Sequence, residues 1–343
     1  MFYLPTSIIL SGYSIITFVY IISNWKEKVE KGLVANEIAI GLLFLVAGIL
    51  FPFMYQFHST LIPLETLNFL WFSTSIILLI EMGIWFITLI YNTIISKRDP
   101  KIMAERDYSK YCEEFNRNWT DDIKDEYGRK ILHLFTCSVI FIFWSLGTIL
   151  DNFGILDKFN LDNYSFSYWL IIIIGFGFIF MVQIADLARL TKFYMLPNWA
   201  RKGYLSMKQE EQETFVASTP LVLSFVPFIF VPFPIFASVA LITAGADAMA
   251  CIIGKKYGKH ALKKNSKKTI EGFIAGGIST FLIVIIIMNL YYTWMPVSII
   301  KIFLMAVTAT IIFLLIDMFA KFISDNILNP ILTGFGMWLI YLL

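Results

Sequence analysis

One stretch of the chain, residues 245–272, combines an acid, spaced glycines and many lysines. Asp247 lies in an apolar run, where an unpaired carboxylate is costly, so it implies a cation or a basic partner. A magnesium ion held by one carboxylate and by substrate phosphates meets that need. Gly254 and Gly258 follow, and glycine lets backbone amides approach an anion closely. Together with the seven lysines of residues 255–268, this pattern predicts a phosphate-binding site.

The same stretch leads directly into the next apolar segment. Lys267, Lys268, Thr269, Glu271 and Gly272 precede or open that segment, and the N-terminal dipole of a helix there favours phosphate. The pattern is not a P-loop, because GxxxxGK[ST] requires four residues between its glycines and a preceding strand. A basic loop resting on anionic lipid headgroups explains the lysines, but it explains neither the aspartate nor the spaced glycines.

The pattern D-x-x-A-x-x-x-G-x-x-x-G followed by K-K-T-x-E-G resembles the signature shared by dolichol kinases, phytol kinases and CTP-dependent diacylglycerol kinases. The matching residues are Asp247, Ala250, Gly254, Gly258, Lys267, Lys268, Thr269, Glu271 and Gly272. That family usually places glycine directly before the aspartate, whereas Ala246 intervenes here. The departure concerns local backbone geometry and leaves the resemblance in class intact.

Two upstream segments extend the resemblance. Arg129-Lys130-Ile-Leu-His133 resembles the R-K-x-x-H that opens the family's core. Arg129 and His133 are one helical turn apart and share a face. Asp186-Leu-Ala-Arg189 resembles the acid-x-x-Arg that ends the following span. Either phosphate contact or snorkelling of charge to the membrane interface explains these residues.

A downstream segment carries the resemblance to the C-terminus, so that it covers about residues 126–343. Asp325-Asn326-Ile-Leu-Asn-Pro330 resembles the family's D-N-x-x-x-P, a second acidic site. The family's preceding glutamate has Asp317 as its counterpart, with a spacing that differs by about one residue.

The resemblance implies a phosphoryl transfer, which needs charge neutralisation and alignment more than covalent chemistry. Asp247 and Asp325 are expected to hold Mg²⁺ on the triphosphate of CTP, and Lys259, Lys267 and Lys268 to cradle the phosphates. Glu271 or one of the aspartates is expected to take the proton of a lipid hydroxyl. The remaining nucleotide-binding residues are expected to be Gly254, Gly258, Thr269, Gly272, Asn326, Arg129 and His133.

The surrounding elements are membrane helices. Hydrophobic residues make up 58% of the 343 residues and charged residues 15%, well below the roughly 25% charged content of soluble domains. Apolar runs near the roughly 20 residues that cross a bilayer recur along the chain. We predict an all-α bundle of about ten spans: 5–23, 36–57, 67–96, 130–150, 165–188, 214–231, 234–253, 271–290, 297–319 and 327–343. Three regions follow: accessory helices (1–96), a charged cytoplasmic segment (97–128) and a lipid-kinase-like core (129–343).

Basic residues occupy alternate loops, and this asymmetry predicts orientation. Lysines and arginines concentrate in 24–35, 97–130, 187–212 and 254–270, whereas 58–66 and 151–164 carry almost none. By the positive-inside rule the basic loops face the cytoplasm. The active site is then cytoplasmic, in the plasma membrane of a prokaryote or the endoplasmic reticulum of a eukaryote. Three cysteines and three histidines without paired spacing indicate neither a disulfide framework nor a transition-metal site.

The expected reaction is CTP-dependent phosphorylation of a membrane isoprenoid alcohol, dolichol or a polyprenol, with no nucleic-acid partner. Phytol or diacylglycerol as acceptor stays open, as does ATP as donor. A CDP-lipid synthase shares the Lys-Lys-Thr-x-Glu-Gly stretch, but residues 317–343 lack its K-D-x-G and H-G-G-x-x-D-R-x-D elements. A transporter explains intramembrane acids without nucleotide chemistry, and a scaffold needs none of the clustered acids and glycines.

Overall fold

The computed structural model describes residues 1–58, 62–119, 123–263 and 268–343. Within these ranges the chain is helical and has no strand, apart from one isolated bridge between Ala261 and Thr269. The α-helices are α1 (Leu4–Ser23), α2 (Trp25–Glu30), α3 (Val34–Leu50), α4 (Leu64–Arg98), α5 (Pro100–Glu105), α6 (Tyr108–Asn118), α7 (Ile123–Asn152), α8 (Asn163–Lys192), α9 (Asn198–Gly203), α10 (Ser218–Leu223), α11 (Phe233–Leu241), α12 (Asp247–Tyr257), α13 (Ile270–Leu290), α14 (Ile299–Phe319) and α15 (Asp325–Leu342).

Eight helical segments of the described chain are long and apolar enough to cross a membrane: Leu4–Ser23, Val34–Phe53, Leu64–Arg98, Leu134–Asn152, Asn163–Met195, Phe233–Tyr257, Ile270–Leu290 and Ile299–Phe319. The prediction of an all-α polytopic membrane protein is confirmed. The number of such segments is eight rather than about ten, because two predicted spans are shorter or more polar than expected.

The first of these two is the predicted span 214–231. It contains the short helix α10 and a 3₁₀ segment, Val226–Phe230, since Pro220 and Pro227 cannot donate backbone hydrogen bonds. The second, 327–343, is α15, whose first turns carry Asp325 and Asn326.

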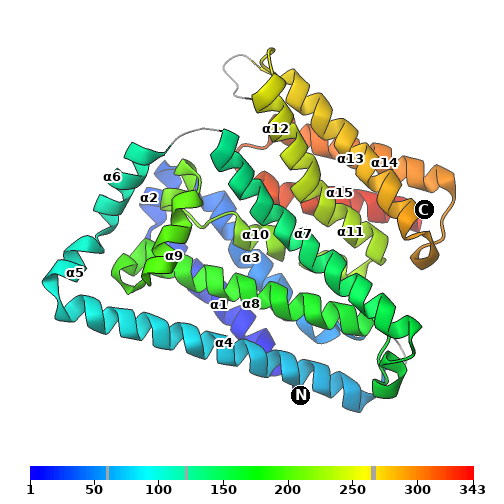
Figure 1. Cartoon of the computed structure of the whole chain (residues 1–343), viewed down its shortest axis with the longest axis horizontal. Coiled ribbons are helices and arrows are strands. Elements are labelled where there is room, and N and C mark those ends of the chain that lie inside the picture. Colours follow the sequence, from blue (N-terminus) through cyan, green and yellow to red (C-terminus); the bar gives the residue numbers. More distant parts are fainter. Residues whose placement is uncertain (59–61, 120–122, 264–267) are drawn as a thin grey trace.

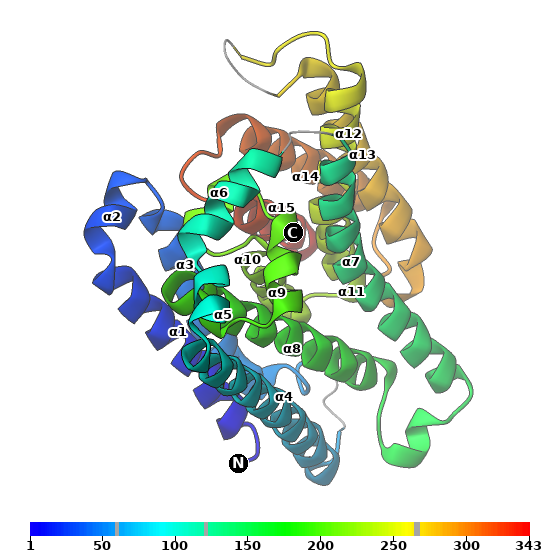
Figure 2. The same ribbon diagram turned by 60° about the vertical axis from the view of Figure 1, so that its left-hand side comes forward.

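Most of the packing in the bundle is between a few pairs of helices. Contacts join α1 to α3, α4 to α8, α7 to α8, α12 to α13, α13 to α14, and α14 to α15. Figure 1 shows α4 and α8 running alongside each other, with α7 crossing toward the α12–α13 pair. Figure 2 shows α12 and α13 rising together to a loop that projects from the bundle. The helices α11 and α12 are joined through a π-helical turn, Ile242–Ala246.

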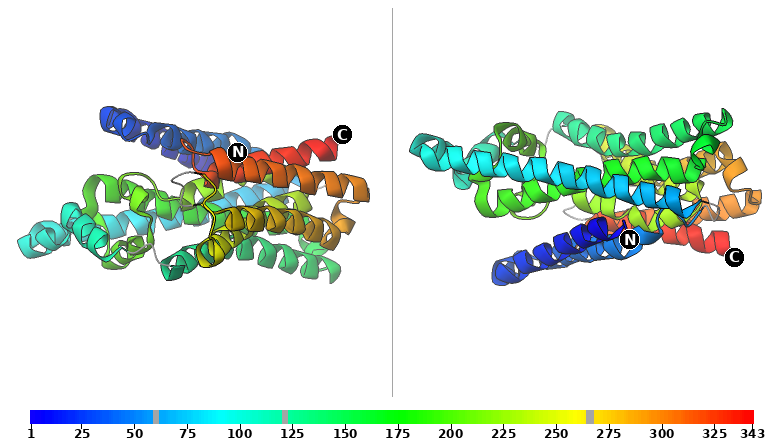
Figure 3. Two further views of the ribbon diagram at one scale, coloured as in Figure 1. Left: turned by 90° about the horizontal axis from the view of Figure 1, so that it is seen from above. Right: turned by 90° about the horizontal axis from the view of Figure 1, so that it is seen from below.

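The basic segments between spans occupy two parts of the molecule's periphery. The elements α2, α5, α6 and α9 lie on the left of Figure 1, and the loop after α12 is at the top. The views from above and below keep α2, α5 and α6 at the same end (Figure 3). The assignment of these segments to the cytoplasmic face of the membrane stays a prediction.

Candidate functional site at the charged end of a membrane cavity

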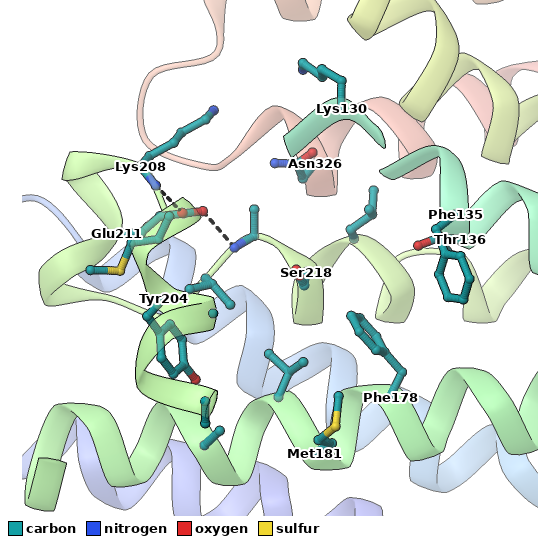
Figure 4. Close-up of a pocket in the computed structure, with 18 of the residues that line it drawn as sticks. Lys130, Phe135, Thr136, Phe178, Met181, Tyr204, Lys208, Glu211, Ser218 and Asn326 are labelled. Carbon is teal, nitrogen blue, oxygen red and sulfur yellow. Dashed lines mark hydrogen bonds between the residues drawn. The ribbon is translucent and has the colours of Figure 1, made fainter. Parts of the chain in front are cut away.

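A cavity of about 330 Å³ lies between α7, α8, α9 and α10 and reaches the first residues of α12 and α15. Most of its lining is apolar, and Figure 4 shows Phe135, Phe178 and Met181 beside it. The charged and amide side chains that line it are Lys130, Lys208, Glu211, Asp247, Asp325 and Asn326. The cavity is therefore amphipathic, as a site for a lipid with a polar head requires.

Asp247 forms an ion pair with Lys130, a residue of α7 that is only 7% exposed. Lys130 is also attracted by Asp325. Lys130 is therefore the basic partner that we expected for Asp247, an acid in an apolar helix. The preceding π-helical turn, Ile242–Ala246, contains the Gly245-Ala246 pair at which the sequence departs from the family pattern. Such turns often lie at functional sites.

Asp325 and Asn326 reach the same cavity from the N-terminus of α15. Ser324 caps this helix by accepting a hydrogen bond of 3.2 Å from the backbone NH of Asn326. Ser324 itself donates its backbone NH to the side chain of Asn36 at 3.1 Å. These contacts fix the residue that precedes Asp325, so the cap determines where the second carboxylate enters the cavity.

The carboxylate pair fits Mg²⁺ by its chemistry. Mg²⁺ is usually bound by one or two carboxylates together with phosphate oxygens and water, and Asp247 and Asp325 are hard oxygen donors that line one cavity. The described residues contain no group of three or more acids, histidines or cysteines that could hold a metal. Phosphate oxygens would have to complete the coordination.

Residues 198–217 cover the cavity on the side of α9, and the buried pair Asp186–Arg189 fixes this segment. Arg189 donates to Asp186 at 2.9 Å and to the backbone carbonyls of Gln212 and Thr214 at 2.9 and 2.5 Å. Asp186 accepts from the backbone NH of Val216 at 2.8 Å. Because both side chains are fully buried, their structural role is to hold this cover and not to reach the membrane interface.

Glu211 fixes the same cover from within. Its carboxylate accepts backbone NH groups from Lys208 and Ala217 at 2.7 and 2.9 Å (Figure 4). Together with Lys208 and Ser218, Glu211 lines the cavity. Sequence reasoning missed these residues because the cover is irregular. It also missed Lys130 as a site residue, although Lys130 belongs to the segment that resembles R-K-x-x-H.

The glycines of the predicted signature lie where α12 and α13 touch. A Cβ at Gly254 would lie 3.0 Å from the Thr269 hydroxyl and 3.4 Å from the Gly272 Cα. A Cβ at Gly272 would lie 2.5 Å from the Ala250 carbonyl oxygen, and one at Gly258 would lie 2.5 Å from Thr269 Cγ2. Small residues spaced by four are typical of close helix crossings in membranes. This contact explains the glycines, and their contact with a nucleotide stays a prediction.

A second polar group, the outer cluster, joins the loop after α12 to the start of α13 and the end of α14; it consists of His260, Lys263, Lys268, Glu271 and Asp317. Glu271 accepts from His260 at 2.7 Å, and Lys268 donates to the Asp317 carboxylate at 2.7 Å. Lys263 donates to the backbone carbonyl of Met318 at 2.6 Å. Lys263 and Lys268 therefore attach the loop to the C-terminal end of α14.

The outer cluster is separate from the cavity, because none of its members lines it. Glu271 contacts His260, beyond the end of α12, while Asp247 is the first residue of that helix. The length of α12 between Asp247 and Tyr257 is about 15 Å at 1.5 Å per residue. The structure thus places Asp247, Asp325 and Asn326 on the lining of one cavity, which Glu271 and Lys268 do not line.

The remaining predicted residues are distributed as follows. Thr269 caps α13 by accepting the Gly272 backbone NH at 3.2 Å. Lys259 is exposed on the loop after α12. Lys267 lies outside the described residues. Arg129 and His133 belong to α7, one turn apart on either side of Lys130, but their side chains lie outside the described part of the structure.

The helical spans define an integral membrane protein, and charged side chains line part of its amphipathic cavity. The chain belongs to the cytidylyltransferase family, whose model matches residues 117–323. This family indicates an enzyme that acts with CTP on a lipid. The matched region includes Lys130, Asp247 and the outer cluster. No curated protein and no solved structure matches the chain.

Proposed function

We propose that the protein is a CTP-dependent lipid kinase that phosphorylates the hydroxyl of a membrane isoprenoid alcohol, dolichol or a polyprenol. The observation that carries this proposal is the presence of Asp325 and Asn326 in the same cavity as Lys130 and Asp247. The Asp-Asn pair belongs to the segment that resembles the lipid kinases, and the C-terminal elements of CDP-lipid synthases are absent from residues 317–343.

The cavity residues support phosphoryl transfer in the following way. The lipid hydroxyl lies at the charged end and its tail along the apolar walls. Asp247 and Asp325 would hold Mg²⁺, which neutralises charge on the triphosphate when bound. The hydroxyl oxygen forms a bond to the γ-phosphorus, the bond from that phosphorus to the β,γ-bridging oxygen breaks, and CDP leaves.

The proton of the hydroxyl goes to a carboxylate of the cavity. Asp247 and Asp325 are favoured over Glu271 as the acceptor, because both line the cavity while Glu271 is hydrogen-bonded to His260 outside it. Lys130 stabilises the charged form of Asp247, which leaves Asp325 as the better proton acceptor of the two, and it offers a positive charge to a phosphate oxygen. Lys259, Lys267 and Lys268 are proposed to steer and bind the nucleotide from the cytoplasmic side.

The division of the chain follows from the same proposal. Residues 129–343 contain most of the cavity lining, and the match to the family begins at residue 117. From residues 1–96, Trp85 lines the cavity. We therefore assign residues 1–96 an accessory role in packing and 129–343 the catalytic role, with 97–128 as a cytoplasmic connection.

Position-specific labels test the reaction. Purified protein in detergent is incubated with Mg²⁺, a polyprenol and CTP labelled on the γ-phosphate or, in parallel, on the cytosine. A kinase transfers the γ-label to the lipid fraction and leaves the cytosine label in CDP. Asp325→Asn provides the matched inactive control.

A second function, synthesis of a CDP-lipid, is favoured by the name of the matching family. In that reaction a lipid phosphate attacks the α-phosphorus, and pyrophosphate leaves. Phosphatidate therefore replaces the polyprenol in a third reaction. Cytosine label in the lipid with release of pyrophosphate would overturn the kinase proposal.

A further inference from the structure

A second, smaller cavity of about 50 Å³ lies next to the first, among helices that include α7, α8 and α10. Val139 and Ile140 of α7, Ile172 and Gly175 of α8, and Val222 of α10 line it. Its lining, as far as the structure describes it, contains no charged side chain. Water has few polar partners there, whereas a hydrocarbon chain fits the chemistry of the walls.

The two cavities follow one another along the same three walls. Thr136 of α7 lines both. On α10, Leu221 lines the first cavity and the adjacent Val222 lines the second. On α8, residues 178–185 line the first and residues 171–176 line the second. The wall from residue 185 to residue 171 is about 21 Å long at 1.5 Å per residue.

We propose that these two cavities form one track for the hydrocarbon tail of the acceptor lipid, with the hydroxyl at Asp247 and the tail passing Thr136 toward Gly175. This inference rests on the proposed function, because it takes the acceptor to be a lipid alcohol. The continuity of apolar walls from a charged end fixes the direction in which a tail points.

The track distinguishes lipid tails by their shape and length more than by their hydrophobicity. Lipid tails in the bilayer are already in an apolar surrounding, so moving a tail between helices gains little transfer free energy. Close packing inside proteins does distinguish tails that fit from tails that do not. On this track an alcohol longer than the first cavity extends into the second one, while a short alcohol does not reach it.

The alternative path for the hydrocarbon tail leads from the first cavity sideways into the bilayer. Phe135 and Trp199 line the first cavity and are 62% and 60% exposed. A tail leaving between them would never meet Gly175. The two routes therefore differ at defined residues, and substitutions on α8 can separate them.

The test uses substitutions of Gly175 that narrow the second cavity. A Cβ there would lie 3.6 Å from Val222 Cγ1, which is ordinary contact, so Gly175→Ala adds a methyl without strain and Gly175→Val adds bulk toward the cavity. Gly83→Val is the matched control, because a Cβ at Gly83 has no neighbour within 4 Å. Transfer from γ-labelled CTP is measured with geraniol and with undecaprenol, and thermal unfolding in detergent reports on folding.

We expect Gly175→Val to lower kcat/KM for undecaprenol about tenfold, equivalent to about 1.4 kcal/mol, and to leave geraniol unchanged within twofold. Gly175→Ala gives a smaller loss, and Gly83→Val gives none. Equal effects on both alcohols, or no effect on either, in variants that unfold like the wild type, would overturn the track.

A photoreactive polyprenol with a diazirine at the tail end decides the question independently of activity. Labelling of residues 171–176 or of Val139 and Ile140 supports the track, even in a protein that transfers no phosphate. Labelling confined to Phe135 and Trp199 shows the sideways route and overturns it. A wild type that phosphorylates neither alcohol but labels at 171–176 contradicts the proposed kinase and retains the tail site.

Discussion

Replacing Gly272 by alanine tests whether the signature glycines serve helix packing or nucleotide binding. The added methyl would lie 2.5 Å from the Ala250 carbonyl oxygen and 3.0 Å from the Gly254 Cα. Both are backbone atoms, so no side-chain rotation relieves the contact. Only a separation of α12 from α13 can do so.

The expected magnitude combines two opposing effects. Overpacking of this kind costs about 1–3 kcal/mol. Alanine in place of glycine in a helix interior returns about 0.5–1 kcal/mol. Because the clash involves backbone on both sides, we expect a net loss of about 1–2 kcal/mol in the free energy of unfolding.

Gly277→Ala, on the same helix, is the control. Its Cβ would lie 3.1 Å from Leu314 Cδ2, the flexible end of a side chain, so the neighbour can move and stability should change little. Thermal unfolding of both variants in one detergent, together with KM for CTP, separates the two roles. If Gly272→Ala unfolds at the temperature of Gly277→Ala while KM for CTP rises, the packing argument is wrong and the glycine serves the nucleotide.

Three further predictions follow from the charged residues. Asp247→Asn and Asp325→Asn should each lower transfer at least about 100-fold, as loss of a positioned charge does, while the protein still elutes as the folded form; near-native rates with Mg²⁺ would contradict the metal site. Arg189→Gln should cost about 3–5 kcal/mol, because it leaves a buried carboxylate uncompensated, and unfolding at the wild-type temperature would refute this. In a background without native cysteines, single cysteines at Lys110 and Lys263 should resist impermeant thiol reagents in intact cells, and labelling from outside would reverse the topology.

The helical fold could be predicted from the sequence because hydropathy is a local property. Apolar runs of about 20 residues have few alternatives in a bilayer, and eight of the ten predicted spans match long apolar helices. Where prolines interrupt the run at 214–231, local patterns could not determine the path, because the neighbours that pack against this segment lie far away in sequence. Two of those neighbours, α8 and α3, pack against α10.

The candidate site was predictable in part. Asp247 was predicted from an acid in an apolar run and Asp325 from the resemblance to the lipid kinases; both line the cavity, and their roles there stay predictions. Lys130 was not assigned a role, because nothing local in the sequence shows that it would pair with an acid 117 residues later. The sequence also could not show whether the glycines let a phosphate approach the backbone or let two helices pack closely. Both roles require only that the Cβ be absent.

The residues that the sequence predicted as one site lie in two separate groups. One group can bind a metal ion and the other can attract a nucleotide. The cavity end holds two carboxylates and one ammonium, so its described acids and Lys130 sum to one negative charge, a setting that attracts a divalent cation and repels a bare triphosphate. The described lysines lie instead in the last turn of α12 and on the loop beyond it, about 12–15 Å away along that helix, where they can attract an anion from solution. If both groups act on one nucleotide, the loop captures the phosphates and the metal makes their approach to Asp247 and Asp325 favourable. Nucleotide affinity and metal affinity then reside in different elements, which explains why the basic loop is attached to α14 through Lys268 and Asp317 rather than to the acids of the cavity.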